Sequence, residues 1–263
     1  MPDLTTAEVA ASLERADILL THGKGPTSIL IRRFTNSHWS HTAMVFVLSD
    51  VATGVSEGYQ HTFVLEAQSH GVDIHAIDKY LFNENKDMAV LRFPPGALPA
   101  ATSGTNQRTS FLRRVRGFAL ERIDDIYGHG KIFTIAQRIL KLPLLRPAFS
   151  VLGLIFATQR EKAVNNSICS GVVQWAYLRA CYGNEAVPGN FSDPFFTSGE
   201  KRRHLIAAAD IRDTFDPDAP FQGTAAAIEL TTPAHFAQAV RDGLLVCVGE
   251  RIGGVWNREL TRL

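Results

Sequence analysis

Three residues, Cys169, His41 and Glu66, have side chains that together could perform nucleophilic catalysis. Residues 165–167 are helix-capping types, and apolar positions from Val172 onward follow helical spacing, so Cys169 is expected in or just before the first turn of a helix. There the helix dipole and the free backbone N–H groups favour a thiolate and can stabilise an oxyanion. The alternative is a buried structural cysteine, because cysteine is among the most buried residue types.

His41 and Glu66 could supply a base and the group that orients it. His41 opens a run of β-forming residues, 41–48, directly after a polar turn. Glu66 lies in the apolar run 64–67, where a carboxylate is costly unless it has a partner. If the strands at 41–48 and 61–67 are antiparallel neighbours, Glu66 reaches the imidazole and stabilises its protonated form. The alternatives are a satisfied surface or core histidine and a solvated edge-strand glutamate.

Hydrophobic patterns and chain breakers predict the elements that must position these residues. Strands are expected at about 16–21, 41–48, 61–67, 71–75, 89–93, 244–249 and 254–257, and helices at about 5–15, 27–34, 109–126, 169–179 and after 232–233. Thr5 and Glu8 have the spacing of a capping box at the start of the first helix. Strands and helices are partly segregated along the chain, which predicts an α+β fold rather than alternating βαβ units.

Composition is ordinary for a globular protein. The chain has 263 residues, enough for one large domain or two small ones, with 45% apolar and 20% charged residues. The formal net charge is +1, which implies no broad electrostatic field and disfavours nucleic-acid binding as the main role.

The cysteines and the N-terminal segment bear on the compartment. Cys169, Cys181 and Cys247 are too few to form a disulfide framework, and a reducing compartment is the simplest interpretation. Residues 1–20 carry acidic residues where a secretory signal needs a basic segment followed by an apolar run. A cytoplasmic location is therefore expected.

One apolar stretch, residues 139–157, contains two prolines and two basic residues, which makes it a poor transmembrane candidate. We expect a buried or interfacial hairpin of short helices there. Core packing is favoured, and the alternative is a surface that contacts a membrane or lipid peripherally.

A metal site is a weaker alternative for the histidines in this part of the chain. His38 and His41 are three residues apart, and His70 and His75 lie further on, but no helical HxxxH spacing and no cysteine pair accompanies them. We therefore assign no metal and no cofactor. Residues 23–28 lack the order of a phosphate-binding loop and are interpreted as a turn at the rim of the cleft.

Four segments, taken together and in order, resemble the circularly permuted NlpC/P60 superfamily. They are ADILLT at 16–21, WSHTAMV at 39–45, VLEA at 64–67 and ICSGVV at 168–173. The closest likeness is to the YiiX/YebB-like branch of bacterial cysteine hydrolases, in which the histidine precedes the cysteine. The segment at 231–236 also resembles an ending often seen there. Gly171 and Val172 replace the usual Glu-Leu after the cysteine, which weakens assignment to that branch.

The resemblance implies a papain-like α+β fold, an antiparallel sheet with the cysteine helix packed on it. It implies one domain over residues 1–263, with a helical insertion at about 135–163. By position, Cys169 matches the nucleophile, His41 the base and Glu66 the residue that orients the base.

Tyr127 matches a tyrosine that lines the substrate site in that family, although a core aromatic at a helix end is an equal alternative. Ser40 and Ser170, the chain neighbours of the histidine and the cysteine, complete the expected substrate-binding set. The expected reaction is hydrolysis or acyl transfer on a small-molecule, lipid or peptide-like substrate. The apolar stretch at 139–157 favours a lipid ester or thioester over a peptide or peptidoglycan amide. A catalytically inert binding module of the same fold is a third possibility.

Overall fold

The computed structural model describes residues 4–47, 62–68, 71–94, 105–123, 126–127, 166–167, 169–182 and 231–262. The expected insertion at 135–163, and with it the apolar stretch at 139–157, lies outside the described residues. No helix within the described ranges has the length and apolar character needed to cross a membrane.

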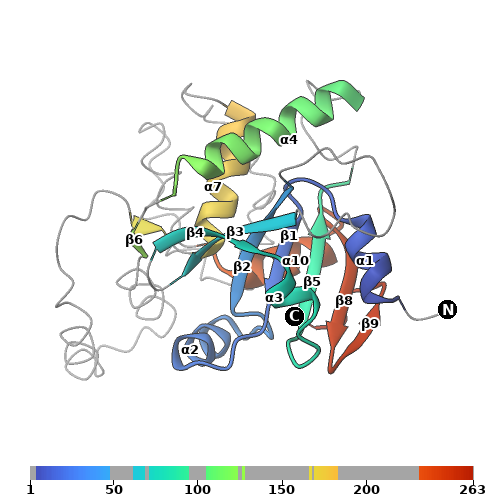
Figure 1. Ribbon diagram of the computed structural model, residues 1–263. Helices are drawn as coiled ribbons and strands as arrows, with labels where there is room; N and C mark the ends of the chain where they lie inside the picture. The colour runs from blue at the N-terminus through green and yellow to red at the C-terminus, as the bar shows by residue number, and fades with distance from the viewer. Residues whose placement is uncertain are drawn as a thin grey trace, which may run out of the picture.

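The centre of the fold is a seven-stranded sheet in the order β4-β3-β2-β1-β5-β8-β9, in which every neighbouring pair is antiparallel (Figure 1). Its strands are β1 (Ile18–Thr21), β2 (His41–Val47), β3 (Thr62–Gln68), β4 (Gly71–Ala76), β5 (Met88–Arg92), β8 (Val246–Ile252) and β9 (Val255–Asn257). A separate parallel pair joins β6 (Ile126–Tyr127) to β7 (Asn166–Ser167). The α+β class with an antiparallel sheet is confirmed.

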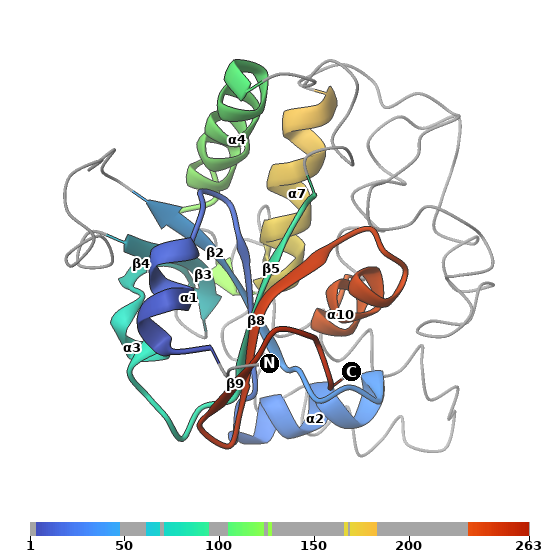
Figure 2. The same cartoon turned by 90° about the vertical axis from the view of Figure 1, so that its right-hand side faces the viewer.

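Helices lie on both faces of this sheet. Their bounds are α1 (Thr6–Ser12), α2 (Pro26–Thr35), α3 (Asp78–Leu81), α4 (Thr105–Leu120), α7 (Cys169–Tyr182) and α10 (Pro233–Arg241). Figure 2 shows α7 and α10 on one side of the sheet and α1 and α3 on the other.

Alternation along the strands builds a separate core on each face. Leu20, Met44 and Leu65 belong to the core that contains Cys169 and the buried side of α7. Their chain neighbours point the other way, into a core that α1 and α3 cover. The strands at the centre are therefore apolar on both faces, which is why they read as continuous hydrophobic runs in the sequence.

The predicted elements are found, with shifted ends. Thr5 caps α1 through the expected capping box with Glu8. The first strand begins at Ile18 rather than at Ala16, because Ala16 has a left-handed backbone conformation with φ of 66°. The four-residue helix α3 was not predicted, since one turn is too short to show a hydrophobic period.

Two contacts fix the helix that begins at Cys169. The Tyr177 hydroxyl donates a hydrogen bond to the backbone oxygen of Ala16 at 2.6 Å, at the entrance to β1. Near the start of the helix, the Ser170 hydroxyl donates to the backbone oxygen of Thr231 at 2.7 Å, just before α10. Both donors are buried, so α7 is held against the sheet and against α10 at separate points.

Candidate active site

Cys169 is the first residue of α7 and is 3% exposed. Backbone N–H groups of Ser170 and Thr42 donate hydrogen bonds to its sulfur. Ser170 lies in the first turn of the helix, where N–H groups have no partner within the helix. Thr42 belongs to β2, so the sulfur sits where the helix meets the central sheet. The expectation that Cys169 occupies a helix N-terminus is confirmed.

His41 is the first residue of β2, and its ring contacts both Cys169 and Glu66. Its Nε2 lies 2.6 Å from Oε2 of Glu66, which leaves Nδ1 as the ring nitrogen available to the sulfur. Because Nε2 donates to a carboxylate, the ring orientation is fixed from the side opposite the thiol. The structure thus brings the three residues together as expected.

Glu66 is buried inside the sheet rather than solvated at an edge. It lies in β3 between β2 and β4, in register with Ala43 and Asp73, and its side chain is 0% exposed. The edge-strand alternative is wrong, because β4 pairs along the outer side of β3 and covers it. Alternation places Glu66 on the face that carries α3.

Residues of α3 complete the environment of this carboxylate. The Tyr80 hydroxyl donates to Oε2 at 2.5 Å, and the Lys79 ammonium donates to Oε1. With the His41 ring, Glu66 has three donors, two of which can carry a positive charge. The cost of burying a carboxylate is offset by these donors.

Cys169, His41 and Glu66 each shift the pKa of a neighbour toward its charged form. Burial alone would raise the pKa of Glu66, but the bonds from His41, Lys79 and Tyr80 outweigh it and hold this pKa well below its usual range. Burial opposes protonation of His41, yet the Cys169 thiolate and the Glu66 carboxylate raise the His41 pKa to about 9.

The pKa of Cys169 shifts in the opposite direction to that of His41. Burial raises the pKa of the thiol, but the charge and hydrogen bond of His41, with the N–H groups of Thr42 and Ser170, lower it overall. Both shifts favour the thiolate–imidazolium form of the pair over the neutral thiol and imidazole. Cys247 differs, because burial raises its pKa to about 12 and keeps it an inert thiol.

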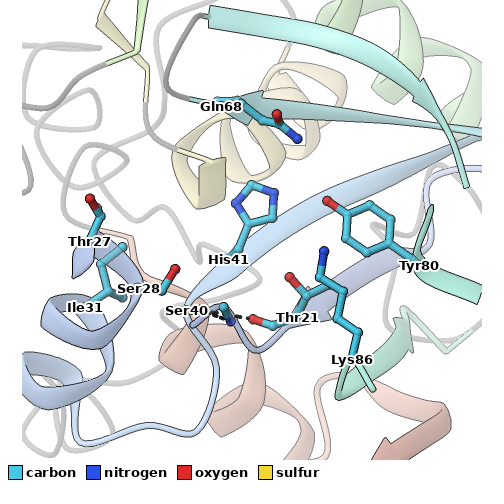
Figure 3. A pocket seen from close by; sticks show the side chains of 11 residues that line it. Thr21, Thr27, Ser28, Ile31, Ser40, His41, Gln68, Tyr80 and Lys86 are labelled. Carbon is cyan, nitrogen blue, oxygen red and sulfur yellow. Dashed lines mark hydrogen bonds between the residues drawn. The ribbon is translucent and has the colours of Figure 1, made fainter. Parts of the chain in front are cut away.

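A pocket of about 290 Å³ opens beside the imidazole of His41 (Figure 3). Its lining comes from the end of β1, the β1–α2 turn, α2, the ends of β2 and β3, α3 and Lys86, and it combines polar and apolar groups. The lining residues are Thr21, Gly23, Thr27, Ser28, Ile31, Ser40, His41, Ala67, Gln68, Tyr80 and Lys86. The turn at 23–28 therefore does form part of the rim, as expected.

The expected substrate-binding residues have different positions. Ser40 lines the pocket, and its hydroxyl oxygen accepts a hydrogen bond from the Gly23 N–H at 2.7 Å. A Cβ at Gly23 would come within 2.2 Å of the Ser28 hydroxyl oxygen, so glycine is needed at this close approach. Ser170 is buried and bonded to Thr231, which gives its hydroxyl a structural role. The side chain of Tyr127 lies outside the described part of the structure.

Sequence reasoning missed Lys79, Tyr80, Gln68 and Lys86. Their positions depend on how β4 and the short α3 fold back under β3, which no local pattern reveals. Figure 3 shows Tyr80 directed toward His41, with Lys86 beside the tyrosine ring. The Lys86 ammonium lies 4.4 Å from the centre of that ring. A buried glutamate in an apolar run was the available signal, since such a group requires donors from somewhere in the fold.

Comparison with known proteins adds no family assignment. No protein-family model matches the sequence, and no curated protein matches it. The functional interpretation therefore depends on the residues and their geometry.

Proposed function

We propose that the protein is a cysteine hydrolase or acyltransferase that works through an acyl-enzyme on Cys169. The observation that carries the proposal is the contact chain in which the His41 ring bonds the Cys169 sulfur on one side and the buried Glu66 carboxylate, at 2.6 Å, on the other. A nucleophile, a base and an oriented third group are what covalent acyl transfer requires.

The reaction would proceed in two halves. The Cys169 thiolate attacks the carbonyl carbon of an amide, ester or thioester, and backbone N–H groups at the start of α7 stabilise the oxyanion that forms. His41 gives its proton to the leaving group as the carbon–leaving-group bond breaks. Water or another acceptor then attacks the thioester while His41 takes its proton, and the carbon–sulfur bond breaks to restore the thiolate.

The resemblance to circularly permuted NlpC/P60 proteins, in the YiiX/YebB-like branch, supports the same proposal. An antiparallel sheet with the cysteine helix against β2 and β3 is consistent with a papain-like fold. The order of the elements, with the histidine strand before the cysteine helix, is also that of the permuted family.

The pocket lining bears on the substrate. Thr21, Ser40, Gln68 and Lys86 present hydroxyl, amide and ammonium groups beside His41, and Ile31 and Ala67 add apolar surface to the same pocket. Hydrogen-bonding side chains favour a polar group next to the bond that is cleaved. This observation favours a peptide-like amide as a second candidate beside the lipid ester or thioester.

The test is to trap the acyl-enzyme. The protein is incubated with a small panel of activated acyl esters and acyl amides, and the intact mass is measured, followed by peptide mapping. We expect one acyl group on Cys169, none on Cys169→Ala, and an unchanged adduct on Cys247→Ala as the matched control. Acylation that persists in Cys169→Ala would reject the mechanism.

A catalytically inert module predicts a different pattern. In that case no acyl group of the panel is transferred, and Cys169 reacts with iodoacetamide no faster at neutral pH than an ordinary thiol. The paired charges of Cys169 and His41 argue for the enzyme, because a merely structural cysteine gains nothing from an ion pair.

A further inference from the structure

A second cluster of chemically capable side chains lies apart from Cys169. It consists of His22, directly after β1, His38, three residues before β2, and Asp87, directly before β5. One nitrogen or oxygen atom from each residue lies within 4.8 Å of the others. The side chains of His38 and Asp87 are each 21% exposed, so the cluster is packed in place yet open to solvent.

Two of the three side chains, His22 and Asp87, are held by a second contact. His22 Nδ1 lies 3.0 Å from the backbone oxygen of His38, so it carries the proton and leaves Nε2 with a free lone pair. One oxygen of Asp87 accepts a hydrogen bond from the Gly253 N–H at 2.9 Å, while its other oxygen lies 2.9 Å from Nε2 of His38. Metal-binding histidines and carboxylates are typically oriented by such outer contacts.

The backbone fixes the three segments relative to one another. The His22 N–H donates to the backbone oxygen of Asp87 at 3.1 Å, and the Ser40 N–H donates to the backbone oxygen of Thr21 at 3.0 Å. The turn after β1, the approach to β2 and the approach to β5 are therefore tied together before any ligand binds.

We propose that His22, His38 and Asp87 form a binding site for a divalent transition metal, with Zn²⁺ the first choice. Two imidazoles and one carboxylate are a familiar three-ligand set for zinc that leaves a fourth position for water. In a tetrahedral site the ligand atoms stand about 3.4 Å apart. The His38–Asp87 pair would open slightly and His22 would move inward, which side-chain rotation can supply. The ion would join the turns that enter β2 and β5.

The site has no sequence motif, since its members are separated by 16 and 49 residues. It is also distinct from the proposed acyl-enzyme chemistry, which uses Cys169 and His41. The two proposals can therefore fail separately.

The experiment uses the full chain with Cys169→Ala, which removes the thiolate as a competing ligand. The protein is treated with a chelator, titrated with Co²⁺ while visible absorption is followed, and then titrated with Zn²⁺ by calorimetry. We expect one equivalent of each ion, displacement of Co²⁺ by Zn²⁺, and a rise in the melting temperature with Zn²⁺.

Variants locate the ion. His22→Ala and, as a variant that preserves shape, Asp87→Asn should each weaken Zn²⁺ binding by about tenfold or more. His75→Ala is the matched control, because this half-buried histidine lies outside the cluster, and it should bind as the parent does. Absence of binding, or binding that His22→Ala and Asp87→Asn leave unchanged, would overturn the proposal.

Discussion

The His41 imidazole links the buried thiol and the buried carboxylate of the site. Cys169 contacts one side of the ring and Glu66 the other, and both raise its pKa against the effect of burial. Glu66 in turn is kept ionised by Lys79 and Tyr80. The reactivity of the thiol therefore depends on residues that never reach the sulfur, because they act through the charge of the ring.

Replacing Glu66 should lower the pKa of His41. Glu66→Gln keeps a hydrogen-bonding group of similar size but removes the charge, so the His41 pKa should fall by about 1 to 3 units. The measurement is a histidine-resolved NMR titration, with the His41 signal identified by its loss in His41→Ala.

Asp73→Asn serves as the matched control for this titration. Asp73 is paired in register with Glu66 on β4, but its side chain is 56% exposed. Its removal should leave the His41 pKa nearly unchanged. Equal shifts in Glu66→Gln and Asp73→Asn would show that the specific contact at 2.6 Å has no special role.

At the residue scale, the sequence indicated Cys169, His41 and Glu66 as candidates but not their surroundings. Glu66 stands out because a carboxylate in an apolar run needs partners. Nothing local reveals that Lys79 and Tyr80 supply them, since their approach depends on the chain reversing after β4. The same limit applies to His22, His38 and Asp87, which three separate turns bring together.

At the scale of elements, α10 begins with an unusual capping box. The Thr232 N–H donates to Nδ1 of His235 at 3.0 Å, and the Thr232 hydroxyl lies 2.9 Å from the same atom. His235 is buried, and burial lowers its pKa to about 4. Since Nδ1 must stay unprotonated to accept a bond from the N–H, the cap requires the neutral ring. The preceding residue, Thr231, accepts the bond from Ser170 that anchors the cysteine helix.

This cap predicts a pH-dependent contribution to stability. The folded pKa of His235 lies below the unfolded value of about 6.5, so the unfolded state binds the proton first as the pH falls. The stability that the neutral ring provides is complete above about pH 6.5 and is lost between there and about pH 4, by up to about 1.4 kcal/mol per pH unit.

His235→Gln should remove that part of the pH dependence. Glutamine can cap from the same position without titrating. Urea denaturation of both proteins at several pH values measures the difference in the free energy of unfolding, which should shrink toward pH 4. A difference that stays constant between pH 7 and pH 4 would contradict the account.

The type and order of the elements were predictable because their patterns are strong. The run of β-forming residues at 41–48 and the helical period after Cys169 each predicted an element within a few residues of its observed bounds. Element ends were less predictable. The left-handed Ala16 delays β1, for example, at a point where the Ala16 N–H donates to the Val45 backbone oxygen and the Val45 N–H donates to that of Asp17.

At the scale of the whole molecule, the end of the described chain returns to the sheet and covers a buried charge. Glu250 is 0% exposed and accepts bonds from the Thr261 N–H at 2.8 Å and the Arg262 N–H at 3.0 Å. The Trp39 indole N–H donates to the backbone oxygen of Arg262 at 3.0 Å. The tail thus connects β8 to the turn that leads into His41.

Removing residues 258–263 should therefore destabilise the whole fold. Glu250 would lose the hydrogen bonds that it accepts from the Thr261 and Arg262 N–H groups, and a hydrogen bond to a charged group contributes about 1.5 to 3 kcal/mol. Urea denaturation measures the loss. A shortened chain as stable as the parent would show that the tail contacts are not needed.

A titration of Cys169 tests its pairing with His41 directly. The ultraviolet absorbance of the thiolate is followed against pH for the wild type, and the same curve for Cys169→Ala is subtracted. We expect Cys169 to ionise below the ordinary thiol pKa of about 8.5 and His41→Ala to move the transition back up. A wild-type transition at or above that ordinary value would contradict this pairing.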